Sequence, residues 1–184
     1  MAKQAVVILA PGFEEIEAVA VIDVLRRAGI EVLAAGLGSR QVVGAHGLAV
    51  QADIVLSELR HPPDAVILPG GMPGSENLGA SPEVAKLVKD VHAAGGICAA
   101  ICAAPAYALA AFGVLRGRRV TCYPGCENRF PPGIQRAPER VVVDGNIVTS
   151  QAPGTALEFA LTLAEILAGK AKADSLRAGM LVTS

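Results

Sequence analysis

Residues 96–105, GICAAICAAP, combine an apolar run with a cysteine that small residues follow. Residues 96–101 are all small or apolar, which is typical of a strand buried on both faces of a parallel sheet. The chain then enters a helix at Cys102 almost without a loop, and Ala100, Ala103 and Ala104 are small enough for so tight a turn. The stretch therefore predicts a buried strand that presents Cys102 at the end of the sheet.

The rest of the chain alternates between short apolar runs and longer amphipathic segments. The apolar runs predict strands over 4–10, 30–36, 64–68 and 118–123, a weak hairpin within 42–56, and a hairpin over 139–150 that turns at Asp144-Gly145. Helical patterns cover 14–28, a segment starting at Ser81-Pro82-Glu83, the residues after Cys102, and a long last helix from Thr155 to near Gly169. This alternation, without a linker or an internal repeat, predicts one α/β domain over residues 1–184, with a doubly wound, mainly parallel sheet and helices on both faces.

Composition narrows the class of protein. Hydrophobic residues make up 52% of the 184 residues but aromatic residues only 3%, so the core must consist of Ala, Val, Leu and Ile. The net charge of −1 gives no electrostatic reason to expect a nucleic acid or a membrane surface as partner. No apolar run approaches the ~20 residues that span a bilayer. The first apolar run breaks at Pro11-Gly12, which favours a buried strand over a signal peptide and hence a cytoplasmic protein.

The four cysteines stand at positions 98, 102, 122 and 126. A chain of this length without an export signal favours reduced thiols. Cys98 and Cys102 are four residues apart in an extended segment, about 13 Å, which is too far for a disulfide. Cys122 and Cys126 flank the turn pair Pro124-Gly125, which could bring them together, although we expect no bridge there.

Cys102 is the candidate nucleophile. Ligands of doubly wound sheets bind at the carboxyl ends of the strands, where Cys102 is expected. A sulfur at a helix N-terminus has a lowered thiol pKa, which favours the thiolate. A cysteine can also be a small buried hydrophobe, and this simpler interpretation suits Cys98 in mid-strand. The turn position of Cys102 favours a reactive thiol.

Glu17 is the candidate acid. In the helix predicted over 14–28 it shares a face with apolar residues at spacings of 4, 7 and 11, namely Val21, Val24 and Ala28. Burial disfavours the ionised form of a carboxyl group unless it is paired. Glu14 and Glu15 fall on other faces and can be solvated. A glutamate in the first helical turn also suits the helix dipole, and the sequence favours neither interpretation over the other.

The glycine pair in Pro69-Gly70-Gly71 follows the strand expected over 64–68. Two glycines allow the backbone to approach another group closely and offer N–H donors for an oxyanion. A glycine pair more often only marks a turn, so this motif is weak by itself.

Four segments together resemble the ThiJ/PfpI superfamily, in the branch that contains DJ-one and the bacterial YajL proteins. They are VVILAPGFEEIEAVAVIDVLRRAGI (6–30), AVILPGGMPGSENL (65–78), AAICAAPAYALA (99–110) and TSQAPGTALEFAL (149–161). The segments keep the order of the family and spread over nearly the whole chain, which makes the resemblance specific.

The resemblance implies a flavodoxin-like fold and a homodimer. It implies an oxidisable Cys102 in a strained elbow, hydrogen-bonded to a protonated Glu17. The residues that match backbone contacts around the thiol are Gly70, Gly71 and Ala103. The residues that match positions near the dimer interface and the site are Arg27, Pro153 and Gly154. Activities reported for the family are conversion of methylglyoxal to lactate, removal of early glyoxal adducts from proteins, chaperone action and protection against oxidative stress.

The sequence departs from the family at Tyr123. Relatives with clear glyoxalase activity carry a histidine there, after the strand that corresponds to 118–122. The three histidines of this chain are His46, His61 and His92, and none is next to the predicted elbow. His46 aligns roughly with a basic residue that the partner subunit brings near the site in some relatives. Tyr123 therefore stands as a site-lining residue, and it weakens the expectation of fast glyoxalase turnover.

Two functions would use the same residues. In an enzyme acting on small α-oxoaldehydes or glycated protein side chains, Cys102 would attack the aldehyde and Glu17 would shuttle the proton. In a non-enzymatic stress sensor or chaperone, Cys102 would instead be oxidised. A peptidase like those of more distant relatives would need a histidine directly after the nucleophile, where this chain has Ala103. No metal or cofactor is expected, because no His or carboxylate accompanies the thiols at ligand spacing and APGFEE lacks the G-x-G-x-x-G fingerprint.

Overall fold

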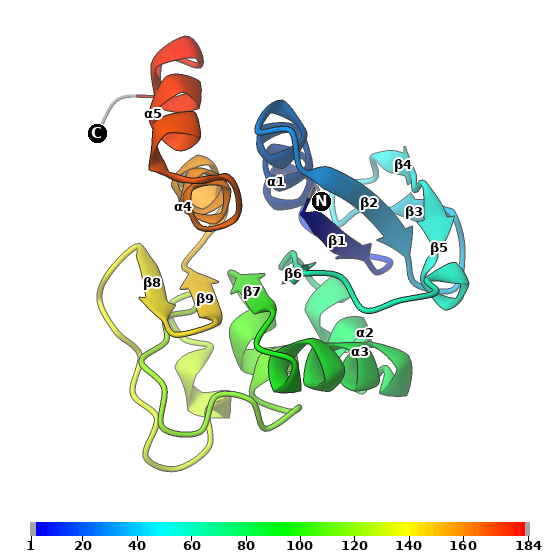
Figure 1. The fold of residues 1–184 in the computed structure, drawn as a ribbon. Coiled ribbons are helices and arrows are strands. Elements are labelled where there is room, and N and C mark those ends of the chain that lie inside the picture. Colours follow the sequence, from blue (N-terminus) through cyan, green and yellow to red (C-terminus); the bar gives the residue numbers. More distant parts are fainter. Residues whose placement is uncertain (1–2, 183–184) are drawn as a thin grey trace.

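The computed structural model describes residues 3–182 and has a seven-stranded sheet at its centre (Figure 1). The strands lie in the order β5 (Ile54–Val55), β2 (Glu31–Gly36), β1 (Gln4–Leu9), β6 (Ala65–Leu68), β7 (Ile97–Ile101), β9 (Ile147–Ser150) and β8 (Val141–Asp144). All neighbouring pairs are parallel except β8 and β9. The predicted α/β fold with a mainly parallel sheet is confirmed.

Helices cover both faces of this sheet (Figure 1). One face carries α1 (Glu15–Arg27), α4 (Ala156–Ala168) and α5 (Lys170–Gly179). The other carries α2 (Gly74–Ala80), α3 (Pro82–Ala93) and the π-helical segment η2 (Pro105–Leu109). The described residues also contain short 3-10 turns: η1 (Leu56–Glu58), η3 (Glu127–Arg129) and η4 (Pro153–Thr155).

The strands divide their side chains between two apolar cores. In β1, Val7 and Leu9 belong to the core under α1 and α4, whereas Val6 and Ile8 belong to the core under α3. All four are fully buried, as expected of a strand whose alternating side chains point to opposite, covered faces. This two-sided burial explains why the run 4–10 is continuously apolar. It also leaves only the ends of the strands open for a site.

The hairpin expected within 42–56 is present as β3 (Gln41–Val43) and β4 (Ala49–Gln51), which form a separate antiparallel pair. The hairpin over 139–150 is present as β8 and β9. The last long helix ends at Ala168, followed by Gly169 with a φ of 90°. The sequence patterns did not predict α2 or α5, which are short amphipathic helices. No helix within residues 3–182 is long and apolar enough to cross a membrane.

The predicted strand 118–123 is wrong. The segment makes only an isolated bridge between Val120 and Arg136. Both edges of β9 are taken, by β7 and by β8, so the segment cannot pair with β9, and it does not join the outer edge of β8 either. Two of its backbone donors go to side chains: Arg119 N–H to Asp144 Oδ2 at 2.8 Å, and Thr121 N–H to Thr149 Oγ1 at 2.9 Å. The N–H of Tyr123 donates to the carbonyl of Cys102.

Candidate functional site

Cys102 sits in a strained turn directly after β7. Its φ is 63°, in the left-handed region that a residue with a Cβ seldom adopts. The turn is fixed from two sides: the N–H of Cys102 donates to the Ser150 carbonyl at 3.0 Å, and its own carbonyl accepts from the Tyr123 N–H at 2.8 Å. Such strain persists only where neighbouring contacts over-determine the backbone. The fold therefore holds the half-buried thiol in one orientation at the carboxyl end of the sheet.

Glu17 lies beside this turn, in the first turn of α1. It is fully buried, and its Oε2 accepts a hydrogen bond of 2.7 Å from the Gly70 N–H. Burial raises the pKa of Glu17 from its usual 4.5 to about 7, the charge of Glu14 adds to the rise, and the Gly70 N–H and the Cys102 thiol oppose it. Its Oε1 has no partner of normal hydrogen-bond geometry among the described residues, although the thiol is near enough to affect the pKa. Glu17 can therefore gain or lose a proton near neutral pH.

The pKa of Cys102 moves in the direction opposite to the sequence-based expectation. Burial raises it, and the charge and hydrogen bond of Glu17 raise it further, whereas the N–H groups of Ala103 and Gly71 lower it. The lowered thiol pKa expected from a helix N-terminus is therefore wrong, because burial beside a carboxylate outweighs the backbone donors. Glu17 loses its proton before the thiol does, so the pair contains a carboxylate next to a thiol at slightly alkaline pH.

Gly70 is the point at which the acid and the thiol meet. A Cβ at this position would lie 2.5 Å from the Cβ of Cys102 and 2.7 Å from Oε2 of Glu17. These distances are too short for any side chain, so the close approach requires glycine. The next residue, Gly71, has a φ of 88° and directs its N–H to the sulfur. Of the three predicted backbone contacts, Gly71 and Ala103 face the thiol and Gly70 faces the carboxylate.

The other predicted site residues lie at different distances from the thiol. Tyr123 is 47% exposed and joins the elbow through its backbone N–H. Pro153 and Gly154 form η4, which follows β9 just beyond Ser150, the residue that binds the Cys102 N–H. Arg27 lies in the last turn of α1, ten residues or about 15 Å along the helix from Glu17, and pairs with Asp23 at 2.7 Å. Arg27 therefore does not reach the thiol of its own subunit.

Glu14 and Glu15 are not solvated, although the sequence pattern allows them to be. Each is only 8% exposed, and both carboxylates approach His46. The sequence pattern missed this cluster because His46 is 31 residues from Glu15 and comes next to it only through the loop between β3 and β4. Of these groups, Glu14 is near enough to Glu17 for its charge to raise the pKa of Glu17.

All four cysteines lie within the described residues and are free thiols. Cys98 and Cys122 are fully buried, and burial raises the pKa of each to about 12. Cys126 is half-buried, and burial raises its pKa as well. Cys98 behaves as the buried hydrophobe that its mid-strand position predicted.

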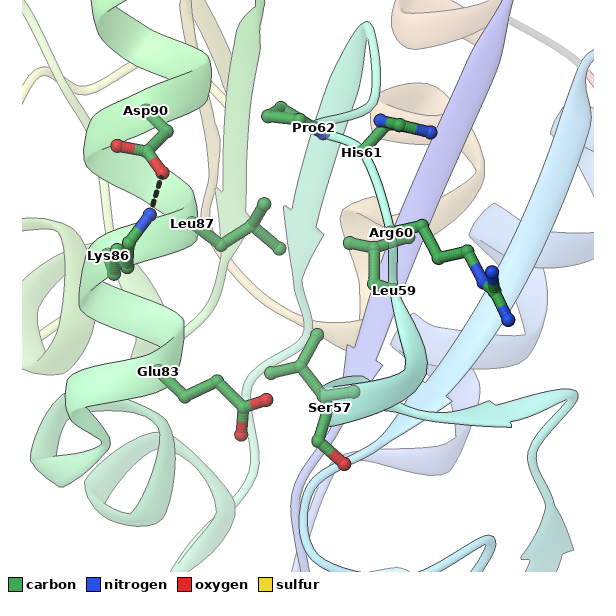
Figure 2. A pocket seen from close by; sticks show the side chains of 10 residues that line it. Ser57, Leu59, Arg60, His61, Pro62, Glu83, Lys86, Leu87 and Asp90 are labelled. Atoms are coloured by element: carbon green, nitrogen blue, oxygen red, sulfur yellow. Dashed lines mark hydrogen bonds and ion pairs between the residues drawn. The ribbon is translucent and has the colours of Figure 1, made fainter.

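A separate cavity of about 190 Å³ lies between the segment 56–62 and α3 (Figure 2). Leu59 and Leu87 point into it, and an ion pair of 2.6 Å between Lys86 and Asp90 borders it (Figure 2). None of the predicted site residues lines this cavity. It is therefore not part of the thiol site.

Comparison with known proteins gives consistent matches over nearly the whole chain. The DJ-1/PfpI family matches residues 3–166. Protein dj-1beta of Drosophila melanogaster is 44% identical over 185 residues, which cover 99% of this chain and 98% of that protein. A Caenorhabditis elegans protein named as a glutathione-independent glyoxalase is 37% identical over 177 residues, covering 95% of this chain and 94% of that protein.

The solved structures agree with these sequence matches. The structure of Toxoplasma gondii DJ-1, described as oxidized, has a TM-score of 0.93 and 39% identity, with 100% of both chains covered. The shared fold is the flavodoxin-like α/β fold with a mainly parallel sheet, as the sequence resemblance implied. On the family match, the sequence identity and the fold together, this chain belongs to the DJ-1/PfpI family.

Proposed function

We propose that this protein is a cysteine-dependent stress-response enzyme that acts on methylglyoxal, glyoxal or their early adducts on protein side chains. The observation that carries the proposal is the juxtaposition of the Cys102 thiol with the Glu17 carboxyl group across Gly70. A buried thiol with a raised pKa is a poor nucleophile alone, but a neighbouring carboxylate can accept its proton as it attacks. The Caenorhabditis elegans relative, which is named a glyoxalase, supports the substrate class.

The first step is addition of the thiol to the aldehyde. The sulfur of Cys102 forms a bond to the aldehyde carbon while the S–H proton passes to the Glu17 carboxylate. The carbonyl π electrons move to oxygen, and Glu17 returns the proton to that oxygen, which gives a neutral hemithioacetal. A carboxyl group with a pKa of about 7 suits both the acceptance and the return of the proton.

The second step moves a hydrogen between adjacent carbons. A base removes the proton from the hemithioacetal carbon, the electrons form an enediol with the neighbouring carbonyl, and a proton then returns to that second carbon. The product is a thioester of lactate, which water hydrolyses to lactate and the free thiol. Glu17 can serve one of these proton transfers. Tyr123 is the residue of this chain where other relatives carry histidine, and a phenol with a reference pKa of about 10 is a weak base at neutrality. We therefore expect slow lactate formation.

A second candidate function is a redox sensor or chaperone that uses oxidation of Cys102 in place of turnover. A peroxide would transfer an oxygen atom to the sulfur, giving a sulfenic acid and then a sulfinic acid. Glu17 in its protonated form could donate a hydrogen bond to the oxidised sulfur. The Toxoplasma gondii relative, whose structure is described as oxidized, is consistent with this candidate.

We also propose that the protein is a cytoplasmic homodimer. Large apolar side chains are exposed on α1 and on the neighbouring β3–β4 hairpin: Ile16, Val19, Val43 and Leu48, at 48–58% exposure. The two elements are joined by a 2.8 Å hydrogen bond from the His46 N–H to the Glu15 carboxylate. Light scattering should give the mass of a dimer, and Val19→Glu should shift it to the monomer. A monomeric parent protein would contradict this part of the proposal.

The decisive experiment follows methylglyoxal loss and lactate appearance by NMR spectroscopy. It compares the parent protein with Cys102→Ser and with Cys126→Ser, the matched control that removes the other half-buried thiol. The proposal expects lactate from the parent and the control, and none above background from Cys102→Ser. Lactate formation that survives Cys102→Ser would refute it. No turnover by the parent, with oxidation of Cys102 by peroxide, would favour the sensor.

A further inference from the structure

Three potential metal ligands converge from two separate parts of the chain. Glu14 and Glu15 enter from the start of α1, and His46 from the loop between β3 and β4. One ligand atom from each lies within 4.8 Å of the others. His46 Nδ1 is 2.9 Å from Glu15 Oε2 and 3.5 Å from Glu14 Oε2. Two ligands held about 2.0–2.1 Å from a tetrahedral zinc ion are about 3.3 Å apart, which lies between these two distances.

The loop is built around Glu15. Oε1 of Glu15 accepts hydrogen bonds from the N–H groups of His46 at 2.8 Å and Leu48 at 3.4 Å. A Cβ at Gly44 would come within 2.3 Å of the same oxygen, so the backbone can close on the carboxylate only because that residue is glycine. These contacts fix Oε1 and leave Oε2 directed at the imidazole. They account for Glu15 as an anchor of the loop.

The carboxylate of Glu14, in contrast to that of Glu15, does not anchor the loop. The residue is 8% exposed, yet its carboxylate accepts no hydrogen bond from the residues that the structure describes. Its nearest cation is the imidazole of His46, at 3.5 Å. Two adjacent carboxylates that are both buried repel each other and lose hydration, which is costly unless a cation compensates them. The carboxylate of Glu14 thus faces a second carboxylate and an imidazole, and a cation bound among the three would compensate both negative charges.

We propose that Glu14, Glu15 and His46 bind a divalent transition-metal ion of the zinc type. Two carboxylate oxygens and one imidazole nitrogen match the mixed O and N ligand set that such ions accept, with water completing the coordination. The ion would offset the charge of both carboxylates. The His46 side chain is 73% exposed in the single subunit and lies on the hairpin that the proposed dimer would cover. The sequence-based expectation of no metal considered only the thiols, which take no part in this site.

A protonated His46 is the competing explanation of the cluster. The hydrogen bond to Glu15 and the charges of Glu14 and Glu15 raise the pKa of His46. A proton there would cancel one of the two negative charges. A metal ion and a proton would compete for the same imidazole nitrogen, so the two explanations differ in whether a metal binds when it is offered.

The test is binding of Co²⁺, as a spectroscopic stand-in for zinc, to the full-length Cys102→Ser protein. Removing Cys102 excludes the reactive thiol as a ligand. The proposal expects one bound Co²⁺ with visible d–d absorption and without the intense sulfur charge-transfer band that thiolate ligands produce. In this background, His46→Ala and Glu14→Gln should each weaken binding by about tenfold or more. The matched control is His61→Ala, which removes an exposed histidine outside the cluster.

The outcomes separate the explanations. Zinc should displace the Co²⁺ in a competition titration with the same dependence on His46. Binding that is equal in the His46→Ala and His61→Ala variants would overturn the proposal, as would unchanged binding in Glu14→Gln. A spectrum dominated by sulfur charge transfer would place the ion on the remaining cysteines and overturn it too. Circular dichroism of each variant shows whether the fold is retained, and the low burial of His46 makes His46→Ala the safest variant in this respect.

Discussion

Replacing Glu17 with glutamine should change how the stability of the protein depends on pH. Glutamine keeps the size of the side chain and an oxygen that can accept from the Gly70 N–H, but it removes the charge. In the parent protein the pKa of Glu17 rises from 4.5 to about 7 on folding. The folded state therefore holds a proton that the unfolded state has already lost between these two pH values.

The sign and the size of the effect follow from this difference in proton binding. Below pH 4.5 the carboxyl group is protonated in both states, and Glu17 costs no charge burial. As the pH rises through 4.5 and up to about 7, the unfolded state is progressively favoured. A tenfold change in proton affinity corresponds to about 1.4 kcal/mol, so the parent should lose about 3 kcal/mol of its free energy of unfolding across this range. Glu17→Gln should not show this loss.

The assay is urea denaturation of the parent and of Glu17→Gln at several pH values from 4.5 to 8, with a chelator present to keep both metal-free. The difference in free energy of unfolding, variant minus parent, should rise by about 3 kcal/mol over the range, whatever its value at the acidic end. Glu83→Gln, which replaces an exposed first-turn glutamate of α3, is the matched control and should stay parallel to the parent. A constant difference between Glu17→Gln and the parent would refute the assignment of a raised pKa to Glu17.

Three further predictions concern the elbow. With limited peroxide, mass spectrometry should find the first added oxygens on Cys102; earlier modification of Cys126 would contradict the assignment of the reactive thiol. Gly70→Ala should abolish Cys102-dependent turnover and destabilise the fold, because its Cβ would lie 2.5 Å from the Cys102 Cβ, whereas Gly154→Ala meets nothing within 4 Å and should be tolerated. Equal thermal stability of these two variants would show that the contact is misplaced. Tyr123→His should raise the rate of lactate formation, by up to about 100-fold if the imidazole reaches the substrate, and a lower rate would show that the phenol itself contributes.

Sequence reasoning works well where a signal is local. The small residues around Cys102 predict the turn because only small side chains fit between a strand and a helix that follow each other directly. The position of Glu17 on an apolar helix face predicts its burial, because the helical period alone decides which residues face the sheet. Both features depend on neighbours in the chain, so no tertiary information is needed to find them.

The predictions that are wrong concern features that depend on residues distant in the sequence. The segment 118–123 has the composition of a strand, but the N–H groups of Arg119 and Thr121 bind side chains instead of a neighbouring strand. The sequence does not predict the burial of Glu14 and Glu15, because His46, in the loop that contacts them, is 31 residues from Glu15 along the chain. The predicted lowering of the Cys102 pKa is wrong. The sequence shows the helix terminus, which lowers a thiol pKa, but it does not show that the fold places the Glu17 carboxylate against the thiol.

The central claim is that Glu17 takes the proton of Cys102 as the sulfur attacks. The rate at which Cys102 reacts with a small neutral electrophile such as iodoacetamide, measured against pH by peptide mass spectrometry, tests it most directly. We predict that the rate in the parent rises to a plateau with a midpoint near pH 7, the pKa of Glu17. In Glu17→Gln the rate should be lower at neutral pH and should keep rising to alkaline pH without that midpoint. A midpoint near 7 that survives in Glu17→Gln would contradict the claim.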